Sequence, residues 1–345
     1  MYFYIINLFL IIIFMCILRK HPKIMWPSCF FGLFLLGSFR AEGIGADYYS
    51  YEQAYFLFLN GHTTSYEWLY VMLNLMCSRI GGYRIVVASV CFLSLIGPIY
   101  YMANNTKNAL ASMWLYITMG FYLWTYIIYR QAIAISFLLF AYEAAKKRRP
   151  LMFIFFVLIA YGFHKIAILS IVIYPILNIR IIRKELVYIC TITIFVTLVL
   201  KEYSMLILNE IKYLFGERFS YYEIEGIQDG GASLAILYFC IFLFILILIS
   251  LQQKENKLKN ADILIFSLFM SICQIIATVF PLANRFGLFF AIPTFILLPN
   301  MIEEKFPSMR KIVCYCVLIP LSFSFFIFSL QSPIGNLVPY RLISF

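Results

Sequence analysis

Two polar residues, Arg130 and His164, stand at the far ends of two apolar segments joined by a basic cluster, Lys146 to Arg149. Arginine presents a planar fork of donors that suits phosphate oxygens, and histidine can act as a general base near neutral pH. Sixteen residues separate Arg130 from Lys146, about 24 Å of helix, and fourteen lead from Pro150 to His164, about 21 Å. If the basic cluster faces the cytoplasm, Arg130 and His164 are neighbours on the opposite face of a membrane.

The composition indicates a membrane protein. Of 345 residues, 63% are hydrophobic and 12% are charged, whereas soluble domains carry roughly 25% charged residues. We therefore expect an all-α polytopic integral membrane protein, with about twelve transmembrane helices in a single transmembrane domain over residues 1–345. The apolar runs that predict these spans are 2–18, 25–39, 85–103, 109–128, 131–145, 151–163, 165–179, 186–200, 233–251, 261–280, 284–301 and 311–330.

Two long loops, about 40–84 and 201–232, are predicted on the outer side. Segment 66–80 is apolar but short and carries two charges, so we interpret it, with 48–60, as an interfacial or re-entrant helix. The second loop is interpreted as an amphipathic helix on the membrane surface. Several spans fall short of the roughly 20 residues that a full crossing needs, which predicts helices that end inside the bilayer beside a water-filled funnel.

Charge counting supports this topology. With both termini outside, the inner loops hold 17 of the 27 basic residues and 6 of the 16 acidic ones, so the inner face carries the whole net charge of +11. This distribution follows the positive-inside rule, and it removes the reason to infer nucleic-acid binding from the charge. If 66–80 crossed the membrane instead, the basic cluster from Arg19 to Lys23 would move outside, which is the worse arrangement.

Cysteines introduced singly at Glu67 and Lys107 test this topology. We expect an impermeant thiol reagent to label position 67 from outside and position 107 only from inside. Labelling of both positions from the same side would contradict the charge count and make 66–80 a crossing helix.

Polar residues collect on the predicted outer side, at the ends of apolar segments or in the loops beside them. One interpretation is structural: the arginines snorkel or pair with outer acids, as Arg40 could with Glu42 or Asp47. The other is that they bind a diphosphate at the bilayer surface, because neither Arg130 nor Arg285 has an acid within ten residues. The set comprises Arg40, Asp47, Glu67, Arg130, His164, Arg218 and Arg285.

Three residues compete for the role of general base. His164 could accept a proton, and the carboxylates of Asp47 and Glu67 could activate a hydroxyl or stabilise an oxocarbenium-like transition state. The outer loops are also rich in aromatic residues, including Tyr51 and Tyr222. These fit an interfacial aromatic belt or sugar stacking, and the sequence does not separate the two.

An ordered set of motifs resembles the EpsG family, whose members look like the Wzy-type polymerases of bacterial surface polysaccharides. No single motif is specific, but the set keeps the family's order over nearly the whole chain. Position 46 departs from the family, since the sequence has Gly45-Ala46-Asp47 where a Thr is often found. The motifs are Arg40-x6-Asp47-Tyr-Tyr-Ser-Tyr51, Glu67-Trp-Leu-Tyr70, Arg130-Gln131-Ala-Ile-Ala134, Ala160-x2-Phe-His164, Arg218-Phe-Ser-x-Tyr222 and Arg285-Phe286.

The resemblance implies a glycosyltransferase that needs neither metal nor cofactor and acts on the outer face of the bacterial inner membrane. It would polymerise undecaprenyl diphosphate-linked repeat units into O-antigen or capsular polysaccharide, with a flippase and a chain-length regulator of the pathway as possible partners. The expected catalytic residues are His164, Asp47, Glu67 and Arg130. The expected diphosphate and glycan contacts are Arg40, Arg218, Arg285, Gln131, Tyr51 and Tyr222.

The sequence also leaves rival functions open. A flippase of lipid-linked sugars would carry charges deep in its spans and show internal repeats, and neither is evident in the sequence. A second rival is another lipid-sugar transferase, such as a ligase that transfers O-antigen to lipid A, or an acyltransferase. An acyltransferase would need a cytoplasmic donor site, which the short inner loops do not suggest.

Overall fold

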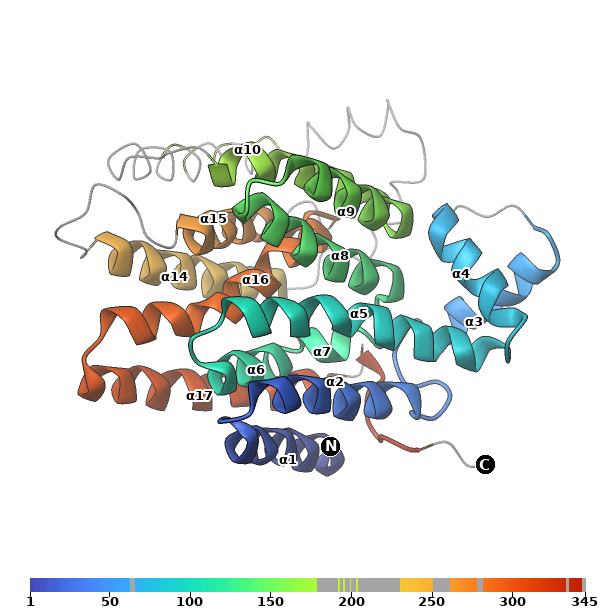
Figure 1. Ribbon diagram of the computed structural model, residues 1–345, viewed down its shortest axis with the longest axis horizontal. Helices are drawn as coiled ribbons and strands as arrows, with labels where there is room; N and C mark the ends of the chain where they lie inside the picture. Colours follow the sequence, from blue (N-terminus) through green and yellow to red (C-terminus); the bar gives the residue numbers. More distant parts are fainter. Residues whose placement is uncertain are drawn as a thin grey trace. The chain divides into compact units, whose positions relative to one another are not determined.

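The computed structural model describes residues 1–62, 66–178, 230–250, 261–277, 282–332 and 335–342, with single positions 192, 195, 199 and 203 (Figure 1). The regular elements in these ranges are all helices, so the all-α prediction is confirmed for this part of the chain. One isolated antiparallel bridge joins Arg40 to Leu342. The chain divides into two compact units, Met1–Tyr174 with Phe295–Phe345, and Pro175–Thr294.

The first unit contains most of the described helices. They are α1 (Tyr2–Leu18), α2 (Pro22–Ser38), α3 (Tyr48–Leu59), α4 (Trp68–Ser78), α5 (Tyr83–Asn105), α6 (Ala109–Thr118), α7 (Phe121–Trp124), α8 (Tyr129–Lys146), α9 (Pro150–Phe163), the 3-10 helix η1 (Lys165–Val172) and α17 (Ser308–Gln331). The second unit contains α14 (Gly230–Ser250) and α15 (Ala261–Ala277). Two helices extend over the division between the units, α10 (Ile173–Asn178) and α16 (Leu282–Lys305).

Most predicted spans coincide with observed helices, but two differ. The run 109–128 is not one helix: it breaks between α6 and α7 at Gly120, whose φ of +79° lies in the left-handed region that glycine tolerates. The run 165–179 begins as the 3-10 helix η1 rather than as an α-helix. The span 186–200 lies almost entirely outside the described residues.

Three described helices are long and apolar enough to cross a membrane, Tyr83–Asn105, Ala283–Glu304 and Ser308–Gln331, and shorter apolar helices accompany them. The count of twelve crossings stays a prediction. Helix α4 has 11 residues, about 16 Å at the usual rise. It is therefore too short to cross the hydrocarbon core of about 30 Å.

Helices α5 and α8 pack with their backbones almost touching. Gly97 lies in α5 just before Pro98, and its N–H donates to the hydroxyl of Ser136 in α8 at 2.8 Å. A Cβ added to Gly97 would lie 2.1 Å from the Ser136 carbonyl oxygen, so only glycine fits here. This contact fixes α8, which carries Arg130 at its first turn.

A network of polar side chains closes one end of the first unit. Lys146 donates to the Asn105 side chain at 2.7 Å, and Asn105 in turn donates to Glu143 at 2.8 Å. The side chain of Asn300 donates to the Asn105 carbonyl at 2.6 Å and accepts from the N–H of Lys107 at 2.7 Å. The turns α1–α2, α5–α6 and α16–α17 lie at this end (Figure 1). These three turns of the first unit, all predicted to face inward, therefore share one end.

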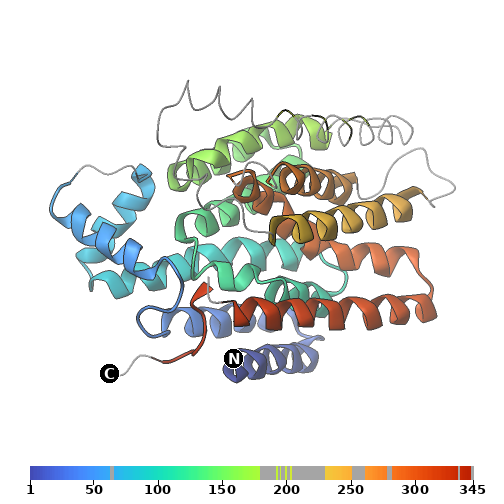
Figure 2. The same ribbon diagram turned by 180° about the vertical axis from the view of Figure 1, so that it is seen from behind.

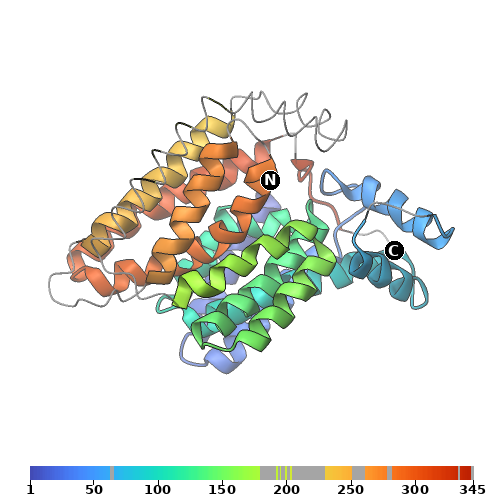
Figure 3. The same cartoon turned by 90° about the horizontal axis from the view of Figure 1, so that it is seen from above.

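The opposite end carries α3 and α4, which extend beyond the α2–α5 helix pair in Figure 3. The C-terminal segment 335–342 returns to this end and lies against the loop after α2 (Figure 2). The N–H of Ala41 donates to the Arg341 carbonyl at 2.8 Å, and the N–H of Gly45 donates to the Asn336 carbonyl at 3.0 Å. Gly45 has a φ of +104°, and an added Cβ would lie 2.1 Å from the carbonyl oxygen of Tyr126.

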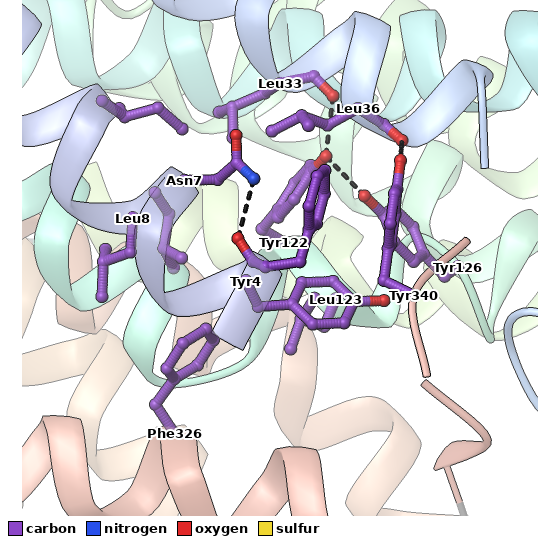
Figure 4. A pocket seen from close by; sticks show the side chains of 13 residues that line it. Tyr4, Asn7, Leu8, Leu33, Leu36, Tyr122, Leu123, Tyr126, Phe326 and Tyr340 are labelled. Atoms are coloured by element: carbon purple, nitrogen blue, oxygen red, sulfur yellow. Dashed lines mark hydrogen bonds between the residues drawn. The ribbon is translucent and has the colours of Figure 1, made fainter. Parts of the chain in front are cut away.

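Tyrosines of α7, of the segment before α8 and of the C-terminal segment hold this arrangement together. Tyr126 donates to the hydroxyl of Tyr122 at 2.6 Å, and Tyr122 donates to the Leu33 carbonyl at 2.7 Å (Figure 4). Tyr340 donates to the Leu36 carbonyl at 2.7 Å. The cavity between these rings and α1 has a volume of about 20 Å³, room for about one water molecule. The tyrosines thus tie α2 to the segment before α8 and to the C-terminus.

Replacing Gly97 should expose how closely α5 and α8 pack. We expect Gly97→Ala to lower the melting temperature of the purified protein, with a loss of about 1–3 kcal/mol, because the added methyl group forces the helices apart. Gly32→Ala is the matched control, since Gly32 lies in α2 with nothing within 4 Å of an added Cβ. An equal melting temperature for Gly97→Ala and Gly32→Ala would contradict the packing described here.

Candidate functional site

Glu67 is the centre of a cluster of charged and polar groups at the α3–α4 end of the first unit. It is the N-cap residue of α4, and its side chain is only 6% exposed. One carboxylate oxygen accepts from Arg130 of α8 in an ion pair. The other oxygen accepts from the backbone N–H of Lys165 at 3.2 Å and lies 3.6 Å from Nδ1 of His164. The structure therefore brings Glu67, Arg130 and His164 together.

His164 reaches this cluster because it is the C-cap residue of α9, which ends at Phe163. Its backbone is extended, with φ −154° and ψ 111°, and the chain then enters η1. The change of direction turns the N–H of Lys165 toward Glu67. Gly162 lets α4 approach closely, since an added Cβ would lie 2.4 Å from the Leu69 side chain. Arg130 and His164, at the two ends of the α8–α9 hairpin, thus both lie against the Glu67 carboxylate.

Arg130 is held by aromatic groups as well as by Glu67. Its guanidinium lies 4.4 Å from the ring centroid of Tyr66, a cation–π contact, and it lies near Tyr51, with which it interacts electrostatically. The Tyr51 ring stacks on Tyr129, with centroids 4.3 Å apart and planes within 6°. The Arg130 side chain is still 23% exposed, so the cation lies at the edge of the site and faces outward in part.

Charge and hydrogen bonds set the ionisation of Glu67. Burial, the largest single effect, raises the pKa of this carboxyl, but the contacts with His164, Arg130 and the Lys165 N–H together outweigh it and lower the pKa to about 2. Glu67 is therefore an anion at neutral pH. A carboxylate with so low a pKa is a poor general base, so its contacts suit it to hold Arg130 and His164 in place.

Arg40 lies fully buried behind this cluster. Its guanidinium donates to the Tyr129 hydroxyl at 2.7 Å, to the Ile44 carbonyl at 3.3 Å and to the sulfur of Cys91 at 3.2 Å. The Tyr126 ring centroid is 4.5 Å away. These contacts position Tyr129, on which Tyr51 stacks. A direct contact between Arg40 and a substrate stays a prediction.

The acids predicted as partners of Arg40 lie elsewhere. Glu42 pairs with Arg84 at 2.9 Å, not with Arg40, and Arg84 also donates to the Arg40 carbonyl at 3.0 Å. Asp47 is half-buried at the N-cap of α3. Burial is the main cause of the raised pKa of the nearby Tyr51 phenol, and the charge of Asp47 raises that pKa further. Asp47 thus borders the cluster, while Glu42, 64% exposed, is a better reporter for thiol labelling than buried Glu67.

The remaining predicted contacts are less informative. Gln131 is buried next to Arg130 in α8. Arg285 is exposed in the part of α16 that belongs to the second unit. Arg218 and Tyr222 lie outside the described residues. Within the described ranges, no three His, Cys, Asp or Glu side chains come together as a metal site would require.

Two residues that the sequence analysis did not assign to the site prove central to its geometry. Tyr66 stacks under Arg130, and Tyr129 links Arg40 to Tyr51. Tyr66 directly precedes Glu67, and Tyr129 directly precedes Arg130. Their position next to a charged candidate site residue is the one feature of the sequence that could have pointed to them. Nothing else in the sequence distinguishes them from the many other tyrosines of an aromatic belt.

Comparison with known proteins adds a family to this geometry. The EpsG family matches residues 23–342, which is nearly the whole chain. The chain belongs to the EpsG family. Membership makes it a membrane protein of polysaccharide biosynthesis. No curated protein and no solved structure matches the chain significantly.

Replacing Glu67 should change how stability depends on pH. Because its folded pKa is depressed, Glu67 stabilises the fold above its unfolded pKa of 4.5, and this contribution is lost as the pH falls toward 2. We expect Glu67→Gln to lose about 3 kcal/mol at neutral pH and to melt with a flatter profile between about pH 5 and about pH 3 than the unmodified protein.

Glu42→Gln is the matched control for this measurement. Its carboxylate also pairs with an arginine but is well exposed, so its loss should cost less than about 1 kcal/mol. Parallel melting profiles for the unmodified protein and Glu67→Gln would show that the buried ion pair does not have the effect described here.

Proposed function

We propose that this EpsG-family protein is a polysaccharide polymerase of the Wzy type. It would transfer a growing glycan from an undecaprenyl diphosphate carrier to a hydroxyl of the next lipid-linked repeat unit, on the outer face of the inner membrane. The observation that carries the proposal is the cluster of Arg130, Glu67 and His164 in a chain whose family acts in polysaccharide biosynthesis.

Each residue has a separate role in the proposed transfer. The acceptor hydroxyl oxygen forms a bond to the anomeric carbon while the bond from that carbon to the diphosphate oxygen breaks. Negative charge then grows on the leaving lipid diphosphate, and Arg130 at the edge of the site stabilises it. The proton of the hydroxyl passes to Nε2 of His164.

Glu67 and Asp47 have supporting roles in this proposal. Glu67 lies on the Nδ1 side of His164 and would fix the orientation of the imidazole, as a carboxylate does for other catalytic histidines. This arrangement favours His164 over Glu67 as the base. Asp47 remains the alternative base, since it borders the cluster through Tyr51. Arg218 and Arg285 would contact the diphosphate of the other lipid, the one that carries the acceptor repeat unit.

Removing Arg130 tests the polymerase. In cells, we expect Arg130→Ala to reduce long-chain polysaccharide to single repeats, read as the ladder on a gel, because the leaving group loses its cation. A loss of about 100-fold or more in polymer is expected for one such group. Arg149→Ala, which removes an exposed arginine at the opposite end of α8 and α9, should leave the ladder unchanged.

The same gel distinguishes the rival functions. Equal membrane levels of the variants must first be shown by immunoblot. A normal ladder from Arg130→Ala would refute the polymerase assignment. A complete absence of repeats, in a strain that lacks the protein, would indicate a flippase or a ligase instead.

A further inference from the structure

A groove along the outer side of α4 is not used by the cluster around Glu67. Its volume is about 540 Å³, within the range of about 300–1,000 Å³ typical of small-molecule sites. The lining is mostly apolar, and its basic members are His62 and Arg79, the C-cap residue of α4. The residues that line it are His62, Tyr66, Trp68, Val71, Met72, Leu75, Met76 and Arg79.

The apolar lining comes from one stripe of α4. Trp68, Met72 and Met76 follow one another at intervals of four residues, so they lie on one face of the helix, and all three are exposed. Methionine side chains are flexible and polarisable and adapt to irregular apolar ligands. The 11 residues of α4 give this stripe a length of about 16 Å.

The groove and the proposed active site share one residue, Tyr66. This ring lines the groove, and the guanidinium of Arg130 lies over it at 4.4 Å. Arg130 itself does not line the groove, so Tyr66 is the residue that the groove and the cluster around Glu67 share. The described residues of the lining include two basic ones, His62 and Arg79, and no acidic one.

We propose that this groove holds the apolar chain of the lipid diphosphate whose charged group binds at Arg130. The inference rests on the proposed function and names the surface that would recognise the carrier. The arrangement supports it, because an apolar stripe that begins at Tyr66, the ring over which the partly exposed Arg130 lies, matches a ligand with an apolar chain and an anionic end. The first isoprene units would lie on Tyr66 and Trp68, and later ones on Met72 and Met76.

The test uses the full-length protein in nanodiscs, with farnesyl diphosphate as a short isoprenoid diphosphate probe. We expect Met76→Glu to weaken its binding by about tenfold or more, because a carboxylate in the groove repels the apolar chain. Phe56→Glu in α3 is the matched control: Phe56 is 54% exposed against 55% for Met76, and it does not line the groove. Its affinity should stay within about twofold of the unmodified protein.

Two results would overturn the inference. The first is a Met76→Glu variant that binds farnesyl diphosphate as well as Phe56→Glu does. The second is displacement of the probe by lysophosphatidylglycerol at equal concentration, which would mean that the groove takes ordinary phospholipid chains. Neither result bears on the polymerase proposal, which the polysaccharide ladder of Arg130→Ala tests separately. A normal ladder from Arg130→Ala, together with a tenfold loss of farnesyl diphosphate binding in Met76→Glu, would refute the polymerase proposal and leave the lipid groove standing.

Discussion

The buried carboxylate of Glu67 is the constraint on which the α3–α4 end of the first unit depends. A carboxylate removed from water is costly unless charges and donors surround it. Its partners are Arg130 at the start of α8, and His164 with the Lys165 N–H just after α9. One side chain therefore holds α4 against the α8–α9 hairpin, and the removal of a partner would leave a buried charge uncompensated.

A second buried charge supports the first. Arg40 is enclosed by carbonyl oxygens, a thiol and two tyrosine rings, and through Tyr129 it fixes the ring on which Tyr51 stacks. Tyr51 in turn lies near the guanidinium of Arg130. Of these two arginines, Arg40 is fully enclosed and shapes the aromatic wall, whereas the Arg130 side chain is 23% exposed at the edge of the cluster.

Much of the fold could be predicted because apolar runs are a local property of the sequence. Helices α1, α5, α8, α9 and α17 fall where hydropathy predicts them, and the spacing within 130–164 correctly predicted that Arg130 and His164 lie at the same end. The break at Gly120 and the 3-10 start at Lys165 were not predicted, because each run is apolar enough on average to be taken as one continuous helix. The competition among bases also stayed open, since it depends on what each acid contacts.

The sequence by itself determined that this is a helical membrane protein of the EpsG family, and that Arg130 and His164 lie at the same end of the α8–α9 hairpin. These properties follow from composition, helical rise and the order of motifs along the chain. Only the tertiary structure decided that Glu67 pairs with Arg130, and that Glu42 pairs with Arg84 rather than with Arg40. It also decided that Tyr66 belongs both to the site and to the α4 groove. The reason is that an ion pair depends on the distance between atoms, and segments 98 residues apart along the chain meet only after the helices have packed.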